Sequence, residues 1–213
     1  MPLARGIAGR TLVALGLVCL AGCATTIRKQ PFPALQQRPA NLSRVAVAPF
    51  GLSPNASREG VPESISDLVA RQVAEELSAR GIAMTPPEDV ARALAAAGLA
   101  DPGADPMAVA RLVADQFGAT ALVIGRVTRY FERTGQRMGT QAPASLGFEV
   151  TLFRAPEGEK LWTGVFDETQ QPLTENAFNM FRYPGGGSRW LSGHELVQWG
   201  AQEMAAALAD LGS

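Results

Sequence analysis

The sequence predicts an α/β fold in which helices pack on a mixed, partly antiparallel sheet. Three observations indicate it. Short runs rich in β-branched residues alternate with stretches of helical periodicity in the first half of the chain. Three strand-like segments then follow one another directly, and an amphipathic helix closes the chain. The predicted order is β-α-β-α-α-β-β-β-α, a single α/β sandwich domain over residues 44–213.

The first predicted unit is a strand, a helix and a second strand. Residues 44–50, RVAVAPF, form a short apolar run that Pro49 and Gly51 end. After a loop, residues 63–80 form the clearest helix, because apolar side chains recur three and four positions apart. The chain reverses at Gly81, and residues 82–84 form the second strand.

Two further helices carry start and stop signals. Thr85-Pro86-Pro87-Glu88 has the pattern of a capping box, with Pro86 at the first helical position. Asp105-Pro106 is a second start signal. Gly98 and Gly118 are typical of helix C-termini.

The second half of the chain predicts an antiparallel meander and a final helix. Its strands are residues 121–135, 146–154 and 160–168, with a loop at 133–145 and a turn at Pro156-Glu157-Gly158. The last helix begins at Ser192, where Glu195 three positions later completes a capping box.

The N-terminus has the pattern of a bacterial lipoprotein signal. Arg5 and Arg10 precede a ten-residue uncharged run, which is too short for a membrane helix of about 20 residues. Leu20, Ala21, Gly22 and Cys23 then match the lipobox. We therefore expect a signal peptide over residues 1–22 and, on Cys23, a diacylglycerol and an N-acyl chain such as palmitate. The alternative is an ordinary signal-peptide cysteine.

Residues 23–43 are expected to be a lipidated N-terminus and flexible tether, because three prolines, few charges and no periodicity occur there. Residue 24 is Ala rather than Asp. Under the enterobacterial sorting rule this predicts the periplasmic face of the outer membrane.

Composition and motifs argue against several functions. Without residues 1–22 the chain has 19 − 2 = 17 basic and 20 acidic residues, so its net charge is −3 and nucleic-acid binding is not expected. Cys23 is then the single cysteine and His194 the single histidine, which predicts no metal site, no disulfide and no cofactor beyond the acyl groups. Asp167 and Glu168 could form an acid/base pair, but adjacent strand residues point to opposite faces.

The segment before the last helix is rich in aromatic and arginine side chains, which are enriched at protein interfaces. The candidate partner surface consists of Phe178, Phe181, Arg182, Tyr183, Arg189 and Trp190. The alternative is that these aromatics fold back as a satellite core.

Several stretches resemble the CsgG/LpoB-like periplasmic lipoproteins, which include the curli-secretion lipoprotein and the activator lipoprotein of a peptidoglycan synthase. The similar pieces are VAVAPF in the first strand, Ala-x-x-x-Val-x-Gly-x-Val-Thr at residues 119–128 and Gly-Glu-x-Leu-Trp at 158–162. The resemblance implies a binding or assembly protein without shared catalytic residues. Pore-forming members insert long hairpins. A membrane strand needs about 9–11 residues, more than the 133–145 loop supplies on each side.

The sequence therefore predicts a non-enzymatic, lipid-anchored envelope lipoprotein that binds another envelope protein in an assembly or transport system. Two alternatives stay open: a homo-oligomeric secretion-pore subunit, and a small-ligand or glycan-binding module that uses Trp190 and Tyr183 for stacking.

Overall fold

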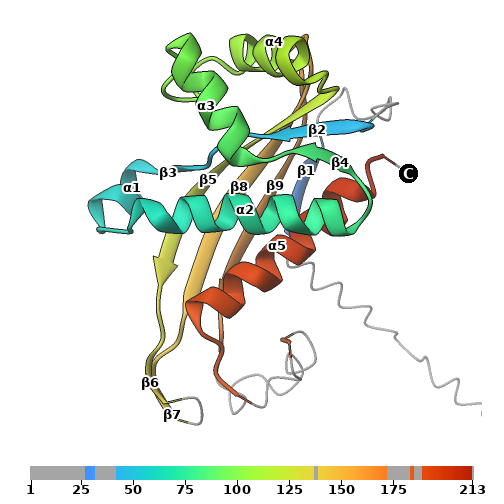
Figure 1. Cartoon of the computed structure of the whole chain (residues 1–213). Helices are drawn as coiled ribbons and strands as arrows, with labels where there is room; N and C mark the ends of the chain where they lie inside the picture. Colours follow the sequence, from blue (N-terminus) through green and yellow to red (C-terminus); the bar gives the residue numbers. More distant parts are fainter. Residues whose placement is uncertain (1–26, 32–41, 137–138, 172–182, 185–188, 213) are drawn as a thin grey trace, which may run out of the picture.

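The computed structural model describes residues 27–31, 42–136, 139–171, 183–184 and 189–212 (Figure 1). A seven-stranded mixed sheet has the order β1-β9-β8-β5-β2-β4, with β3 also paired to β5. The strands are β1 Ile27–Pro31, β2 Arg44–Val47, β3 Gly51–Leu52, β4 Ala83–Thr85, β5 Ala121–Phe131, β6 Thr134–Gln136, β7 Gly139–Ala142, β8 Ser145–Arg154 and β9 Lys160–Thr169. The helices are α1 Pro54–Arg58, α2 Glu63–Ala79, α3 Pro87–Ala97, α4 Pro106–Phe117 and α5 Gly193–Ala209.

The predicted meander is confirmed. β5, β8 and β9 pair antiparallel in sequence order, so that Val127, Phe148 and Phe166 lie side by side in one row. On its other edge β5 pairs parallel with β2. The sheet is therefore mixed, as the alternation of strands and helices predicted.

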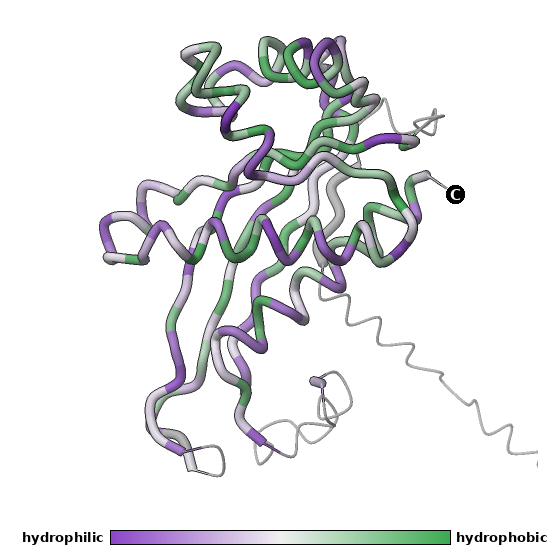
Figure 2. Tube along the Cα trace, in the orientation of Figure 1, coloured by the Kyte–Doolittle hydropathy of each residue, from purple (hydrophilic) through white to green (hydrophobic). Residues whose placement is uncertain are grey.

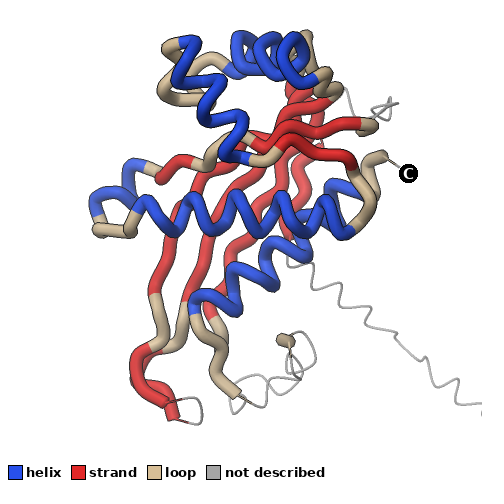
Figure 3. The backbone as a smooth tube through the Cα atoms, in the orientation of Figure 1, coloured by secondary structure: helices blue, strands red, loops and turns tan. Residues whose placement is uncertain are grey.

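Helices cover the two faces of the sheet unequally. α2 and α5 lie across one face, and α3 and α4 cover the other, with α3 against β2 and α4 against β5 and β8 (Figures 1 and 3). Strand β2 shows the division, because Val45 and Val47 belong to the core under α2 and α5 while Ala46 and Ala48 belong to the core under α3 and α4. Figure 2 shows hydrophobic residues in the strands of the sheet and in the helices that pack on it.

Most predicted helix signals are confirmed. The Asp105 side chain accepts from the N–H of Ala108, and Ser192 and Glu195 form a complete capping box. Gly98 and Gly118 end their helices in the left-handed conformation. The predicted capping box at Thr85 is wrong. Thr85 ends β4 and is buried, and α3 begins at Pro87 after Pro86 without a side-chain cap.

Several short elements form where a loop or the tether was predicted. Within the predicted tether, β1 pairs antiparallel with β9 at the edge of the sheet. β1 is an edge strand, and edge strands are where a proline such as Pro31 occurs in sheets. β6 and β7 form a small hairpin within the 133–145 loop. α1 follows Ser53-Pro54, where the Ser53 side chain accepts from the N–H of Ala56.

Candidate functional site

The candidate site lies at one end of the sheet, which we call the distal end. It consists of residues 130–133, the β6 and β7 strands, residues 169–171 and residues 189–193. The β6–β7 hairpin extends beyond α2 and α5 at this end, opposite α3 and α4 (Figure 1). The predicted partner segment meets the sheet here. Phe178, Phe181 and Arg182 lie outside the described residues.

Tyr183 belongs to the core rather than to a contact surface. It is 4% exposed, and its ring lies edge-on to Trp199 with centroids 5.5 Å apart. Its hydroxyl donates to Oε1 of the buried Glu168 at 3.0 Å and accepts from the N–H of Gln171 at 3.3 Å. The prediction of Tyr183 as a partner or stacking residue is therefore wrong, because a buried phenol that satisfies a buried carboxylate is unavailable to a ligand.

The buried side chain of Gln170 holds the backbone on both sides of Trp190. Its amide nitrogen donates to the carbonyl oxygen of Arg189 at 2.8 Å, and its oxygen accepts from the N–H of Leu191 at 2.6 Å. Arg133 Nη1 donates to the carbonyl oxygen of Trp190 at 2.9 Å. These three hydrogen bonds fix the backbone that carries the half-buried side chain of Trp190.

Arg189 pairs with Glu195 at the start of α5, with 2.6 Å between Nη2 and Oε1. The hydrogen bond from Arg189, aided by the N–H of Ser192, lowers the pKa of Glu195 to about 2. The helix N-terminus also favours a negative charge at this position. Of the predicted partner residues, Arg189 is therefore engaged in fixing the start of α5.

Glu132 joins the end of β5 to the same helix start. Its carboxylate accepts from the Tyr130 hydroxyl at 3.0 Å and from the N–H of Gly193 at 2.9 Å. Burial, followed by the charge and hydrogen bond of Glu132, raises the pKa of Tyr130 to about 12. A Cβ on Gly193 would lie 2.5 Å from the Tyr130 oxygen, so a larger residue would displace the Tyr130–Glu132 pair.

Phe131 is the apolar residue that the sequence interpretation missed. It ends β5 with 50% of its surface exposed, and within the described ranges only Met107, at 48%, is a comparably exposed large hydrophobic residue. Met107 lies on α4 at the other end of the molecule. An aromatic residue two positions before Arg133, where β5 leaves the core, is the signal that could have identified it.

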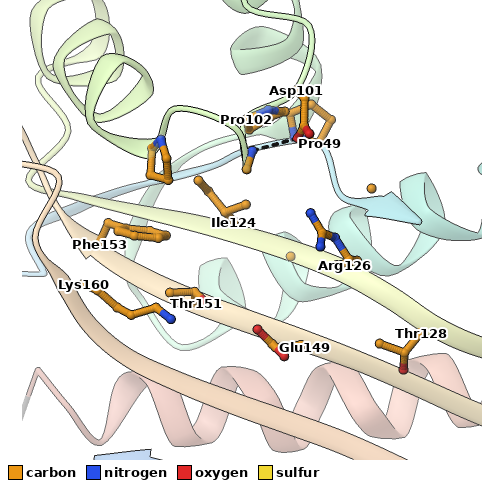
Figure 4. Close-up of a pocket in the computed structure, with 14 residues that line it drawn as sticks. Pro49, Asp101, Pro102, Ile124, Arg126, Thr128, Glu149, Thr151, Phe153 and Lys160 are labelled. Atoms are coloured by element: carbon orange, nitrogen blue, oxygen red, sulfur yellow. Dashed lines mark hydrogen bonds between the residues drawn. The ribbon is translucent and has the colours of Figure 1, made fainter. Parts of the chain in front are cut away.

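A pocket of about 200 Å³ opens on the sheet face beside the α3–α4 connection (Figure 4). Arg126 and Glu149 face each other across β5 and β8, and Asp101 and Lys160 add one charge of each sign. Its lining also includes three prolines and two threonines: Pro49, Pro102, Pro106, Thr128 and Thr151. Balanced charges suit a small polar ligand better than a strongly charged one.

The two adjacent carboxylates of β9 have separate structural partners. Asp167 forms an ion pair with Arg129, and Glu168 accepts from Tyr183 on the opposite face. His194 is exposed in the first turn of α5. Among the described residues, no group of three His, Cys, Asp or Glu side chains could hold a metal ion, and no helix is long and apolar enough to cross a bilayer.

The chain matches no protein-family model and no curated protein. Among solved structures it is similar to the PelC dodecamer from Paraburkholderia phytofirmans, with 18% identity, 88% of this chain and 96% of that chain covered, and a TM-score of 0.46. It is also similar to lipoprotein GNA1162 from Neisseria meningitidis, at 22% identity, 64% and 86% coverage and a TM-score of 0.42. The LpoB C-terminal domain from Escherichia coli is similar at 14% identity, 65% and 100% coverage and a TM-score of 0.34. Likenesses at this level carry no information on what the chain binds.

Proposed function

We propose that this chain is a lipid-anchored bacterial envelope lipoprotein, held through Cys23 at the periplasmic face of the outer membrane. Its role is non-catalytic: it binds another envelope protein and assists an assembly or transport system. The lipobox, Leu20-Ala21-Gly22-Cys23, supports the anchor. Anchoring raises the concentration of the domain at the membrane, so that a modest interface suffices for binding.

One observation carries the binding role. The apolar side chain of Phe131 is half exposed at the end of β5, two residues before Arg133, whose guanidinium binds the carbonyl oxygen of Trp190. A preorganised aromatic surface loses little conformational entropy on binding, which favours a specific protein contact. Isolated exposed apolar residues are common, but this one lies at the same end of the sheet as Trp190, whose backbone is fixed by side-chain hydrogen bonds.

Site-specific photo-crosslinking in living cells tests this role. A photoreactive amino acid would replace Phe131 or Trp190, and Met107 is the matched control because it is equally exposed at the other end. We expect adducts to one envelope protein from positions 131 and 190 and none from 107. Adducts of the chain to itself would instead favour the homo-oligomeric alternative. Equal adducts from all three positions would contradict a specific surface.

The pocket beside Arg126 favours a second candidate function, the binding of a small polar ligand such as a peptidoglycan fragment. Its charged groups and threonines can hydrogen-bond hydroxyl and amide groups. Calorimetric titration with soluble peptidoglycan fragments tests this function. Binding that Arg126→Ala abolishes would support it, and no heat at millimolar fragment would exclude it.

A further inference from the structure

The direction of β1 determines which end of the domain lies near the lipid. β1 runs antiparallel to β9, with Ile27 opposite Phe166 and Pro31 opposite Trp162. β9 runs toward the distal end, where Thr169, Ser145 and Phe131 share one row of the sheet. Following the chain backwards from Pro31 to Ile27 therefore leads toward the distal end.

The length of chain before β1 limits where Cys23 can be. Cys23 precedes Ile27 by four residues, which span at most about 14 Å. The row of Thr169 lies three residues beyond Phe166, or about 10 Å along the sheet. The acylated cysteine can therefore reach the level of Phe131 in a direct extension of β1.

The opposite end is beyond this reach. Lys160 begins β9 six residues from Phe166, about 20 Å away from the level of Ile27. Met107 lies at this opposite end too. Its Cα would be 2.6 Å from a Cβ placed on Gly158, and Gly158 lies in the turn that precedes Lys160 and β9. The end that bears α3 and α4 cannot adjoin the acyl chains unless β1 detaches from β9.

We infer that the distal end is apposed to the membrane, with Phe131 and the β6–β7 hairpin at the lipid headgroups. The inference rests on the acylation of Cys23 in the proposed function, and it is independent of any protein partner. It also restricts that partner, because a surface at the headgroups meets a membrane protein or one bound at the membrane surface.

The charges of the distal end are compatible with this orientation. The carboxylates of Asp167 and Glu195 are paired with Arg129 and Arg189, and that of Glu132 accepts three hydrogen bonds. Paired carboxylates are repelled less by anionic lipid than free ones. Phe131 adds an exposed apolar ring, which can be buried at the boundary between headgroups and acyl chains.

Fluorescence quenching by lipid tests the orientation. The acylated full chain would be purified from cells and reconstituted into phosphatidylethanolamine–phosphatidylglycerol vesicles that contain a headgroup-labelled quencher lipid. Residues 1–22 contain Cys19, and the thiol of Cys23 is blocked, so an introduced cysteine is the single free thiol of the processed protein. Phe131→Cys and Met107→Cys would each carry the same small fluorophore.

The inference predicts loss of fluorescence at position 131 and none at position 107. An insertion of twelve Gly and Ser residues between Thr26 and Ile27 adds a flexible span of about 19 Å and should abolish the loss at position 131. Three results would overturn the orientation but not the anchor, provided that the protein floats with the vesicles. They are loss of fluorescence at position 107 alone, loss at both positions, and loss at neither. Protein that fails to float and lacks acyl mass would overturn the anchor, and the orientation with it.

Discussion

The Tyr183 hydroxyl donates a hydrogen bond of 3.0 Å to Oε1 of Glu168, and both residues are buried. This bond joins the segment before α5 to the last strand of the sheet. It explains why a carboxylate can end a strand inside the protein: a buried acceptor is tolerated when a donor satisfies it. The segment before α5 is therefore attached to the core through Tyr183.

Tyr183→Phe should destabilise the domain by about 1–3 kcal/mol, because it removes the donor to Glu168 and the acceptor for Gln171. Urea denaturation followed by circular dichroism measures the effect. Tyr130→Phe is the matched control, since it removes a hydroxyl from the more exposed pair with Glu132. An equal loss of stability in the two variants would contradict a core role for Tyr183.

Gly200→Ala should destabilise the packing of α5 on the sheet. A Cβ at this position would lie 2.8 Å from Phe148 and 3.0 Å from Phe166, two buried rings that cannot move aside freely. Two rings so close should put the overpacking cost at about 2–3 kcal/mol, and the gain of about 1 kcal/mol in helix propensity leaves a net loss of about 1–2 kcal/mol.

Gly51→Ala is the control for this substitution, because nothing lies within 4 Å of its added methyl group. Thermal denaturation of both variants checks the prediction. A Gly200→Ala protein that melts at or above the wild-type temperature would show that α5 is not held closely against these rings.

The Glu195 carboxylate should make stability depend on acid pH. Its pKa is lowered to about 2 from an ordinary value of 4.5, so its contribution is present above pH 4.5 and is lost as the pH falls toward about 2. The two side chains of the Arg189 pair are 27% and 32% exposed, so solvent screening limits the effect to about 0.5–1 kcal/mol. In Glu195→Gln, the difference in the free energy of unfolding between pH 5 and pH 2.5 should be smaller by that amount. The same pH dependence in the variant and the wild type would contradict the role of the Glu195 carboxylate.

Gln170→Ala should expose the chain after Arg189 to trypsin. The Gln170 amide holds the carbonyl group of Arg189, which is the group that trypsin attacks. Loss of two hydrogen bonds of about 1 kcal/mol each predicts about a tenfold or greater increase in cleavage. Gln198→Ala, at an exposed position of α5, is the control. Equal cleavage of both variants, measured by mass spectrometry, would count against this anchoring.

Periodicity and helix signals were sufficient to predict the core of the fold. The meander of β5, β8 and β9 and the capped α5 were predicted because alternation and capping residues act locally. β1 could not be predicted, since its pairing depends on the backbone of an edge strand rather than on its own apolar pattern. Thr85 shows the opposite error, a local capping pattern that the burial of a strand overrides.

The candidate site was predictable only in part. The sequence indicated the aromatic segment, but it could not show that Tyr183 turns inward to a buried carboxylate while Trp190 stays half exposed. That outcome depends on contacts with Glu168 and Gln170, which lie 15 and 20 residues earlier in the chain. Phe131 was not identified, because strand alternation does not show where a strand extends beyond the helices that cover the sheet.

The most direct test of the account is the intact mass of the protein extracted from its native membrane. The account predicts a chain that begins at Cys23 and carries the added mass of a diacylglycerol and an N-acyl chain. It also predicts that Cys23→Ala leaves an unacylated chain with residues 1–22 attached. An unmodified Cys23 in the wild-type protein, or a wild-type chain that retains residues 1–22, would contradict the lipid anchor and the orientation inferred from it.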